Sequence, residues 1–317
     1  MTSAIRVDRY TSGEKPVWDR FIAQSKNGLF LFYRDYMDYH ADRFPDYSLM
    51  FFNDEQTLLA VMPATLKDSV LSSHAGLTFG GIVSDTRMKT PLMLEIFDAL
   101  KAFLKAAGIR QLVYKAIPHI YHQLAAEEDL YALYRQGAML FRRDVSSTIG
   151  MKEKLSFSKG RKYEIKQAQK SGLEVMQSQD FRSFMAIEEQ VLGAKHDAKP
   201  VHTAAEIEML AKKFPSNIRL FAAQRSEQML AGVIIYESRN VAHAQYIAAN
   251  DEGKETGALD LILSFLINDY YAAKKYFDFG ISTEDDGREL NAGLIANKES
   301  FGARAVVYDF YELGVNT

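Results

Sequence analysis

A duplicated order of secondary-structure elements constrains the fold of this chain more than any other feature. Apolar periodicity predicts a helix, a strand, a helix that ends in glycine and a strand, at residues 89–108, 109–118, 127–137 and 139–149. The same order of helix and strand patterns returns about 165 residues later, at 258–275, 276–282, 290–302 and 303–313. A period this long exceeds that of solenoid repeats, so the pattern indicates duplicated domains.

Length and composition agree with two domains. The chain has 317 residues, with 47% hydrophobic and 25% charged side chains, which is typical of globular domains with full cores. We therefore predict a mixed αβ protein (α/β with α+β character). It would contain two tandem domains, residues 1–150 and 151–317, each with a mixed central sheet flanked by helices. The boundary is expected near Gly150.

Composition also excludes several kinds of chemistry. The chain has no cysteine, which removes disulfides, thiolate nucleophiles and cysteine-based metal sites. Its net charge of −3 gives no global attraction to DNA or RNA. No apolar run is long enough to cross a bilayer, and the N-terminus lacks a secretory signal pattern. We expect a cytoplasmic protein without a metal cofactor or an integral membrane segment.

Local signals support several single elements. Pro16 lies in the first turn of a helix, where proline is tolerated, and two β-prone runs around Gln56 predict a hairpin. Thr203 and Glu206 have the spacing of a capping box. The glycine-rich run 71–83 reads as strand-like. Its glycines allow either a bulged strand or close approach of a ligand.

The stretch 241–313 carries the strongest functional signals. The loop after strand 241–248 leads into a helix N-terminus at Gly257 and Ala258, where free N–H groups can bind an anion, with Lys254 close by. Alternation along that strand predicts that His243, Gln245 and Ile247 share one face. His243 could act as a base, contact a substrate, or simply pair within the sheet.

Two further positions follow along the chain. Asp278 lies between Phe277 and Phe279 on a predicted buried strand, where a carboxylate is costly unless it is paired. It would serve either in a structural ion pair or in the site. Ser282 comes where this strand ends, and strand ends are the usual ligand positions in open α/β sheets.

The spacing N-x6-K-x3-G at Asn291, Lys298 and Gly302 resembles a motif of the acyl-CoA N-acyltransferase (GNAT) superfamily. There the corresponding tyrosine donates a proton to the leaving thiolate, so the resemblance places Lys298 at the acid position. The lysine, with Phe301 and Gly302 behind it, resembles the FemAB-type branch. Those proteins carry two such domains and join an acyl or aminoacyl group to an amine of a cell-envelope precursor. The alternative is that Lys298 faces solvent on its helix.

The resemblance implies acyl-CoA as co-substrate, bound by Lys254, Gly257, Ala258 and Asn291. The glycine loop departs from the family pattern because Leu259 stands where a small residue is expected. The equivalent region of the first half has no glycine, so that domain is expected to lack its own cofactor site.

Substrate contacts are predicted from both halves: Ser73, His74, Arg161, Gln245 and Ser282, around a cleft expected between the domains. Arg161 lies on a basic helix that also carries Lys159, Lys162, Lys166 and Lys170. This helix reads either as a solvated face or as a phosphate contact.

Three functions are compatible with these observations. The first is an N-acyltransferase that uses acyl-CoA to acylate an amino sugar, a sugar nucleotide or another surface-glycan precursor. The second is a FemAB-type enzyme that uses aminoacyl-tRNA to extend a peptidoglycan peptide. The third is a binding module that kept the fold without the chemistry.

Overall fold

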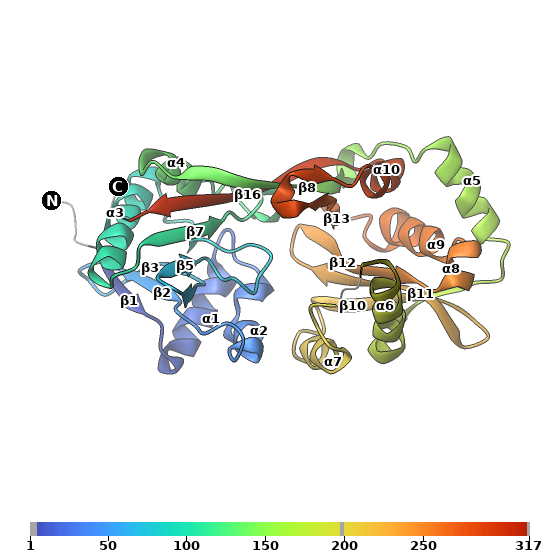
Figure 1. Ribbon diagram of the computed structural model, residues 1–317, viewed down its shortest axis with the longest axis horizontal. Coiled ribbons are helices and arrows are strands. Elements are labelled where there is room, and N and C mark those ends of the chain that lie inside the picture. Colours follow the sequence, from blue (N-terminus) through green and yellow to red (C-terminus); the bar gives the residue numbers. More distant parts are fainter. Residues whose placement is uncertain (1–4, 197–199, 316–317) are drawn as a thin grey trace. The chain divides into compact units, whose positions relative to one another are not determined.

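The computed structural model describes residues 5–196 and 200–315. The chain divides into two compact units (Figure 1). Unit 1 comprises Met1–Asp144, Asp285–Glu289 and Val307–Thr317, and unit 2 comprises Val145–Glu284 and Leu290–Val306. Both contain mixed sheets and helices, which confirms the predicted fold class.

Unit 1 begins with a small antiparallel sheet in the order β1-β2-β3-β6. Its strands are β1 (Arg6–Arg9), β2 (Leu49–Phe52), β3 (Leu58–Met62) and β6 (Val83–Ser84). The β2–β3 hairpin is the one predicted around Gln56, which adopts a left-handed φ of 62° in the turn. Helix α1 (Lys15–Gln24) has Pro16 in its first turn, also as predicted.

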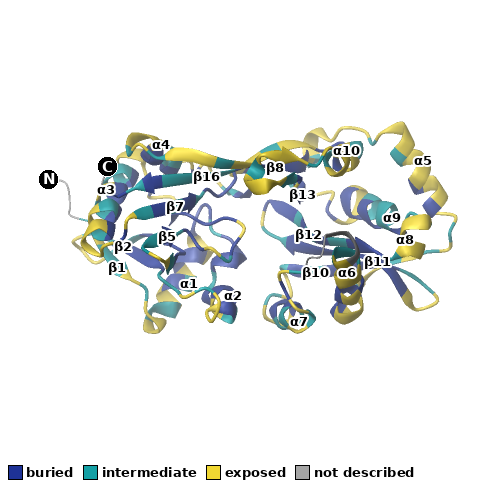
Figure 2. Ribbon diagram, in the orientation of Figure 1, coloured by how far each residue is buried: buried dark blue, intermediate teal, exposed yellow. Residues whose placement is uncertain are grey.

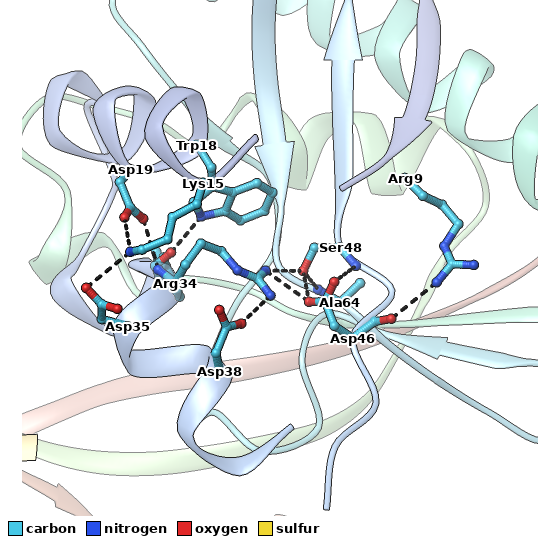
Figure 3. A network of polar contacts seen from close by, with 11 residues as sticks. Arg9, Lys15, Trp18, Asp19, Arg34, Asp35, Asp38, Asp46, Ser48 and Ala64 are labelled. Carbon is cyan, nitrogen blue, oxygen red and sulfur yellow. Dashed lines mark hydrogen bonds and ion pairs between the residues drawn. The ribbon is translucent and has the colours of Figure 1, made fainter. Parts of the chain in front are cut away.

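A buried arginine ties the first helices of unit 1 to this hairpin (Figure 3). Arg34, at the start of α2 (Arg34–Met37), donates to Asp38 at 2.5 Å, to Asp46 at 3.0 Å and to Ser48 at 3.2 Å. Its guanidinium also lies 3.9 Å from the ring centroid of Tyr10. Because the side chain is only 3% exposed, these carboxylates offset the cost of burying its charge. Arg34 therefore serves the packing of unit 1.

The second sheet of unit 1 contains strands β4 (Thr65–Lys67), β5 (Val70–Ser72), β7 (Gln111–Lys115) and the end of β16 (Arg304–Gly314). β5 runs parallel to β7, whereas β16 pairs antiparallel with β7 from Phe310 to Gly314. Helices α3 (Thr90–Ala106) and α4 (Glu128–Arg135) supply apolar side chains to the core over these strands.

The glycine-rich run 71–83 is mostly irregular, so its prediction as a strand is wrong. β5 ends at Ser72, and β6 includes only Val83 of the run. Gly81 has a φ of +95°, and a Cβ there would lie 2.6 Å from the Tyr114 hydroxyl. That hydroxyl accepts a hydrogen bond from the amide of Ile82. Close packing on Tyr114 thus takes the place of strand pairing.

Unit 2 is built on a sheet segment of six neighbouring strands, in the order β8-β13-β12-β11-β10-β9. Its strands are β9 (Glu174–Ser178), β10 (Ile218–Arg225), β11 (Gln228–Glu237), β12 (Val241–Ala249), β13 (Tyr276–Ile281) and, from Val145 onward, β8 (Met139–Gly150). Only the β12–β13 pair within this sheet is parallel, among the pairings of the described residues. Two short strands, β14 (Thr283–Glu284) and β15 (Glu289–Leu290), follow in the connection after β13.

Among the described residues, six α-helices accompany this sheet. They are α5 (Lys159–Ala168), α6 (Phe181–His196), α7 (Ala204–Lys213), α8 (Asp251–Glu255), α9 (Ala258–Phe265) and α10 (Ala292–Ser300). The capping box at Thr203 and Glu206 is present. The helix predicted over 258–275 is shorter than expected, since α9 passes into a π-helical turn over Leu266–Tyr270.

The last strand of each predicted half pairs with a strand of the other half. Residues 145–150 of β8 pair with β13 in unit 2, with Thr148 opposite Asp278. The end of β16 pairs with β7 in unit 1. Each unit therefore contains a terminal strand from the other half of the sequence. The division of the chain into domains at Gly150 stays a prediction.

Candidate active site

The site is organised by the point at which β12 and β13 stop pairing. Their parallel register runs from Val241 opposite Tyr276 to His243 opposite Asp278. Beyond this point β12 continues to Ala249 and β13 to Ile281 without recorded pairs between them. Gly280, with a φ of +77°, interrupts the regular geometry of β13. An opening in the sheet thus follows directly after His243 and Asp278.

A cavity of about 410 Å³ adjoins this opening. Apolar side chains form much of its wall: Ile247, Leu259, Leu263, Phe279, Leu294 and Phe301. Three cationic side chains, Arg161, Lys254 and Lys298, also line it. Its volume lies within the usual range for small-molecule sites, and its mixture of apolar walls with a few charged groups is typical of them.

Lys298 is buried, with 6% of its surface exposed, so the alternative of a solvent-facing lysine is wrong. Its ammonium donates to the carbonyl oxygens of Gly280 at 2.9 Å and Ile281 at 2.7 Å. Burial lowers the pKa of Lys298 to about 8, although the nearby Asp278 carboxylate acts in the opposite direction. Since an ammonium has three donors, one N–H remains for a ligand in the cavity.

Asp278 and His243 form a hydrogen-bonded dyad. Asp278 is fully buried and accepts from His243 Nδ1 at 2.7 Å, Ser146 Oγ at 2.6 Å and Thr148 Oγ1 at 2.7 Å. Burial alone would raise the pKa of Asp278, but these hydrogen bonds and the histidine lower it to about 2. The carboxylate is therefore ionised at neutral pH. Its three hydrogen bonds offset the cost of burying a charge that the sequence led us to expect.

The dyad fixes the imidazole of His243. With Asp278 ionised, Nδ1 carries a proton, which leaves the Nε2 lone pair available as a base. Across the described part of the chain, Nε2 has no hydrogen-bond partner. The His243 side chain is 14% exposed, so the ring is held mostly out of solvent.

The cavity and the dyad lie on opposite faces of the sheet. His243 is opposite Tyr236 of β11, whereas Ile247 is opposite Val233, and consecutive β11 residues alternate between faces. The reason is a register shift in β12, which leaves Gln245 without a partner in β11. The prediction that His243, Gln245 and Ile247 share one face is therefore wrong. Both groups approach the opening, but from different sides.

The loop before α9 has the geometry expected of an anion site, with one difference. Gly257 adopts a φ of +70° at the N-cap of α9, and it lines the cavity together with Lys254. The first-turn N–H groups of a helix have no intrahelical partner, which favours an anion there. However, Asp260 already places a carboxylate in this turn, where it forms an ion pair with Arg161.

Other predicted residues occupy structural positions. Ala258, the first residue of α9, is buried in the core. Asn291 caps α10, where its side chain accepts from the amide of Leu294 at 2.9 Å and donates to Glu284. Ser282 is buried, and its hydroxyl has no partner among the described atoms. None of these three side chains, nor that of Gln245, is among the residues that line the cavity.

Ser73 and His74 belong to unit 1, and both are buried. The Ser73 hydroxyl accepts a hydrogen bond from the amide of Lys115 at 2.7 Å. His74 has a φ of 65°, and its burial lowers the pKa to about 3, with His40 contributing in the same direction. Ser73 thus has a clear structural contact, and the substrate role of both residues stays a prediction.

Sequence reasoning missed the hydroxyl donors of the dyad. Ser146 and Thr148 lie on β8, and they precede Asp278 by 132 and 130 residues. Only the pairing of β8 with β13 brings them to the carboxylate. The available signal was the Ser-x-Thr alternation on a predicted strand. This pattern does not indicate which distant carboxylate the two hydroxyls contact. The Arg161–Asp260 ion pair was also missed, because its two residues lie 99 positions apart in the sequence.

No metal-binding cluster accompanies these groups in the part of the chain that the structure describes. Groups of three or more His, Cys, Asp or Glu side chains with metal-binding geometry are absent there. The same residues include no helix that is both long and apolar enough to span a bilayer.

Comparison with known proteins defines the class. The family model of the GNAT acetyltransferase domain matches residues 156–286, from the segment before α5 to the turn after β14. No curated protein matches the chain. This match covers less than half of the chain, and it makes the second half similar to an acetyltransferase domain of the GNAT type.

Solved structures extend the likeness to the whole chain. FemX superposes with a TM-score of 0.67 at 12% identity, over 96% of each chain. L-PGS from Bacillus licheniformis gives 0.59 at 11% identity, over 89% of this chain and 92% of that one. A tandem GNAT protein from the clavulanic acid biosynthesis pathway gives 0.51 at 10% identity, over 98% of both. The chain has a GNAT-superfamily fold of the FemAB-like type.

Proposed function

We propose that this protein is an amide-forming N-acyltransferase, with unit 2 as its catalytic part. The acyl group of an acyl-CoA would lie in the cavity beside Lys298. The acceptor would be an amino group of a cell-envelope or surface-glycan precursor, such as an amino sugar or a sugar nucleotide. The single observation that carries this proposal is the buried, pKa-lowered ammonium of Lys298 in a cavity beside the opening between β12 and β13.

The residues supply each need of the reaction. The amine nitrogen attacks the acyl carbon from the dyad side of the opening, and a proton of the amine passes to Nε2 of His243. Asp278 stabilises the imidazolium that forms. The free N–H of Lys298 stabilises the negative charge that develops on the acyl oxygen, as an oxyanion-hole donor does.

Collapse of the tetrahedral intermediate breaks the carbon–sulfur bond and releases a thiolate. A pKa of about 8 leaves Lys298 mostly protonated at neutral pH, and the same value allows it to give up a proton. The thiolate takes up this proton directly from Lys298, or it takes up a proton from solvent. The products are an amide and a free thiol. Arg161 and Lys254 would contact the phosphates of the donor.

An aminoacyl-tRNA donor is the second candidate, and one observation favours it. Asp260 places a negative charge in the first turn of α9, where the pyrophosphate of a CoA donor would otherwise bind. A donor without a pyrophosphate avoids this repulsion. The acyl ester of a tRNA would react by the same steps, with a ribose hydroxyl as the leaving group in place of the thiol.

The test compares donors and acceptors on the same protein. Thermal shift with acetyl-CoA, longer acyl-CoAs and UDP-amino sugars identifies ligands, because one present at 100 times its Kd adds about 2.7 kcal/mol of stability. Release of free thiol then reports turnover. Lys298→Met should abolish most turnover, whereas the matched Lys254→Met should mainly raise KM. Absence of stabilisation by any CoA thioester, together with activity on an aminoacyl-tRNA, would replace the first candidate with the second.

A further inference from the structure

The outer face of α5 carries a row of lysines that the proposed reaction does not use. Lys159, Lys162 and Lys166 lie on α5, and Lys170 lies in the turn that follows it. Their spacing of three, four and four residues places them on one side of the helix. All four are exposed. The ribbon of α5 is largely in the colour of exposed residues in Figure 2. We call these four residues the lysine face.

The charges of the lysine face are uncompensated. None of its lysines forms an ion pair with the described residues. The only acidic side chain of α5, Glu164, forms an ion pair with Arg161 at 2.9 Å, and Arg161 lines the cavity beside Lys298. Like charges four residues apart destabilise a helix. An anionic partner would turn this repulsion into attraction.

A hollow of about 470 Å³ lies beside the lysine face. Lys154, Lys162 and Lys166 line it, and it has no acidic residue in its wall among the described side chains. Its apolar wall contains Leu155, Phe157 and Ile165. At the outer surface, Leu155 is 45% exposed and Tyr163 is 64% exposed. The hollow thus combines three cations with apolar groups at an exposed rim.

We propose that the lysine face docks this protein on an anionic phospholipid bilayer. The lysines lie against the headgroup layer, and one headgroup phosphate occupies the hollow between Lys154, Lys162 and Lys166. Tyr163 and Leu155 reach the boundary between headgroups and acyl chains, where such side chains are favoured. Clusters of four or more basic residues on a helix are typical of this mode of attachment.

Nucleic acid fits the same surface less well. All four charges are lysines, which suit a diffuse anionic surface, whereas bidentate contacts to phosphate favour arginine. Tyr163 is the one exposed aromatic ring on α5, so the face lacks the row of stacking platforms that single strands need. A protruding helix also cannot enter the narrow major groove of double-stranded RNA.

The test is co-sedimentation of the full chain with phosphatidylcholine vesicles, with and without phosphatidylglycerol. Binding should require phosphatidylglycerol and should weaken as salt is raised. Each lysine near the surface contributes about 1 kcal/mol, so Lys162→Gln with Lys166→Gln should lower the partition coefficient about thirty-fold. The control is Lys212→Gln with Lys213→Gln, two exposed lysines at the end of α7 in the same unit.

Circular dichroism and melting temperature establish that both double variants are folded. Equal partitioning of the two variants would overturn the proposal, as would absence of binding to anionic vesicles. A single-stranded RNA oligonucleotide is the third arm. If the wild type binds this RNA and ignores phosphatidylglycerol vesicles, the lysine face is a nucleic-acid surface and the bilayer proposal is wrong. None of these readouts depends on acyl transfer.

Discussion

Replacement of Lys298 by methionine should separate catalysis from stability. Methionine has a similar length and no charge, so it fills the same space without the ammonium. If the ammonium stabilises charge that develops in the transition state, kcat and kcat/KM should fall together by roughly 10² to 10³. The melting temperature at pH 7 should change little, although the side chain is buried.

The magnitude follows from two opposing contributions. Burial lowers the pKa of Lys298 from 10.5 to about 8, which corresponds to about 3 kcal/mol of unfavourable free energy for the charged form. Loss of its hydrogen bonds to the carbonyls of Gly280 and Ile281 costs about 1.5–3 kcal/mol each. These contributions largely cancel, so we expect a net loss below about 2 kcal/mol. This expected loss is smaller than the loss of about 3–5 kcal/mol that usually follows removal of one partner from a buried ion pair.

The pH dependence gives a sharper result. Between pH 8 and 10.5 the folded state releases the Lys298 proton while the unfolded state still holds it, so wild-type stability rises with pH in this window. The Met variant lacks this increase. Urea titrations of both proteins from pH 7 to pH 10.5 measure the difference, and Lys254→Met, an exposed lysine of the same cavity, is the matched control. Parallel wild-type and Met curves across this window would refute the reasoning.

Three further outcomes are expected. Asp278→Asn should lower the free energy of unfolding by about 2 kcal/mol at pH 7. The difference from wild type should shrink as pH falls from about 4 towards 2, because the lowered pKa of Asp278 contributes stability only above this window. Urea titration at several pH values measures this difference. Gly280→Ala should cost at least about 1 kcal/mol and shift the NMR signals of His243, since a Cβ at this left-handed position would lie 3.3 Å from the imidazole Cε1. Glu188→Gln should stabilise by up to about 3 kcal/mol at pH 8 and have little effect at pH 4, because burial raises the pKa of Glu188 from 4.5 to about 7, so its charged form increasingly opposes folding as pH rises between these values. Unchanged melting at pH 8 would contradict this assignment.

Local rules were sufficient for most elements. The hairpin around Gln56, the capping box at Thr203 and the amphipathic helix α3 each depend on residues within one short segment, and all three are present. The duplicated order of helices and strands is also present in the described elements. Such features are readable because their energetics come from neighbours in sequence.

The environment of the site could not be read in this way. Helix α10 buries Lys298 and leaves Leu294 42% exposed, so its sequence pattern points to the wrong face. The register shift at Gln245 depends on the pairing of β12 with β11, which alternation along one strand does not encode. Motif spacing was enough to predict Lys298 as a site residue. Its lowered pKa could not be predicted, because it depends on burial in the folded protein.

Because the terminal strands are exchanged, each half of the chain supplies a strand that the other half needs to complete its sheet. A fragment that starts after Gly150 lacks the β8 residues Ser146 and Thr148, so Asp278 would be left buried without two of its donors. A fragment that ends there lacks the part of β16 that pairs with β7. Neither half of the sequence is therefore expected to fold fully without the other.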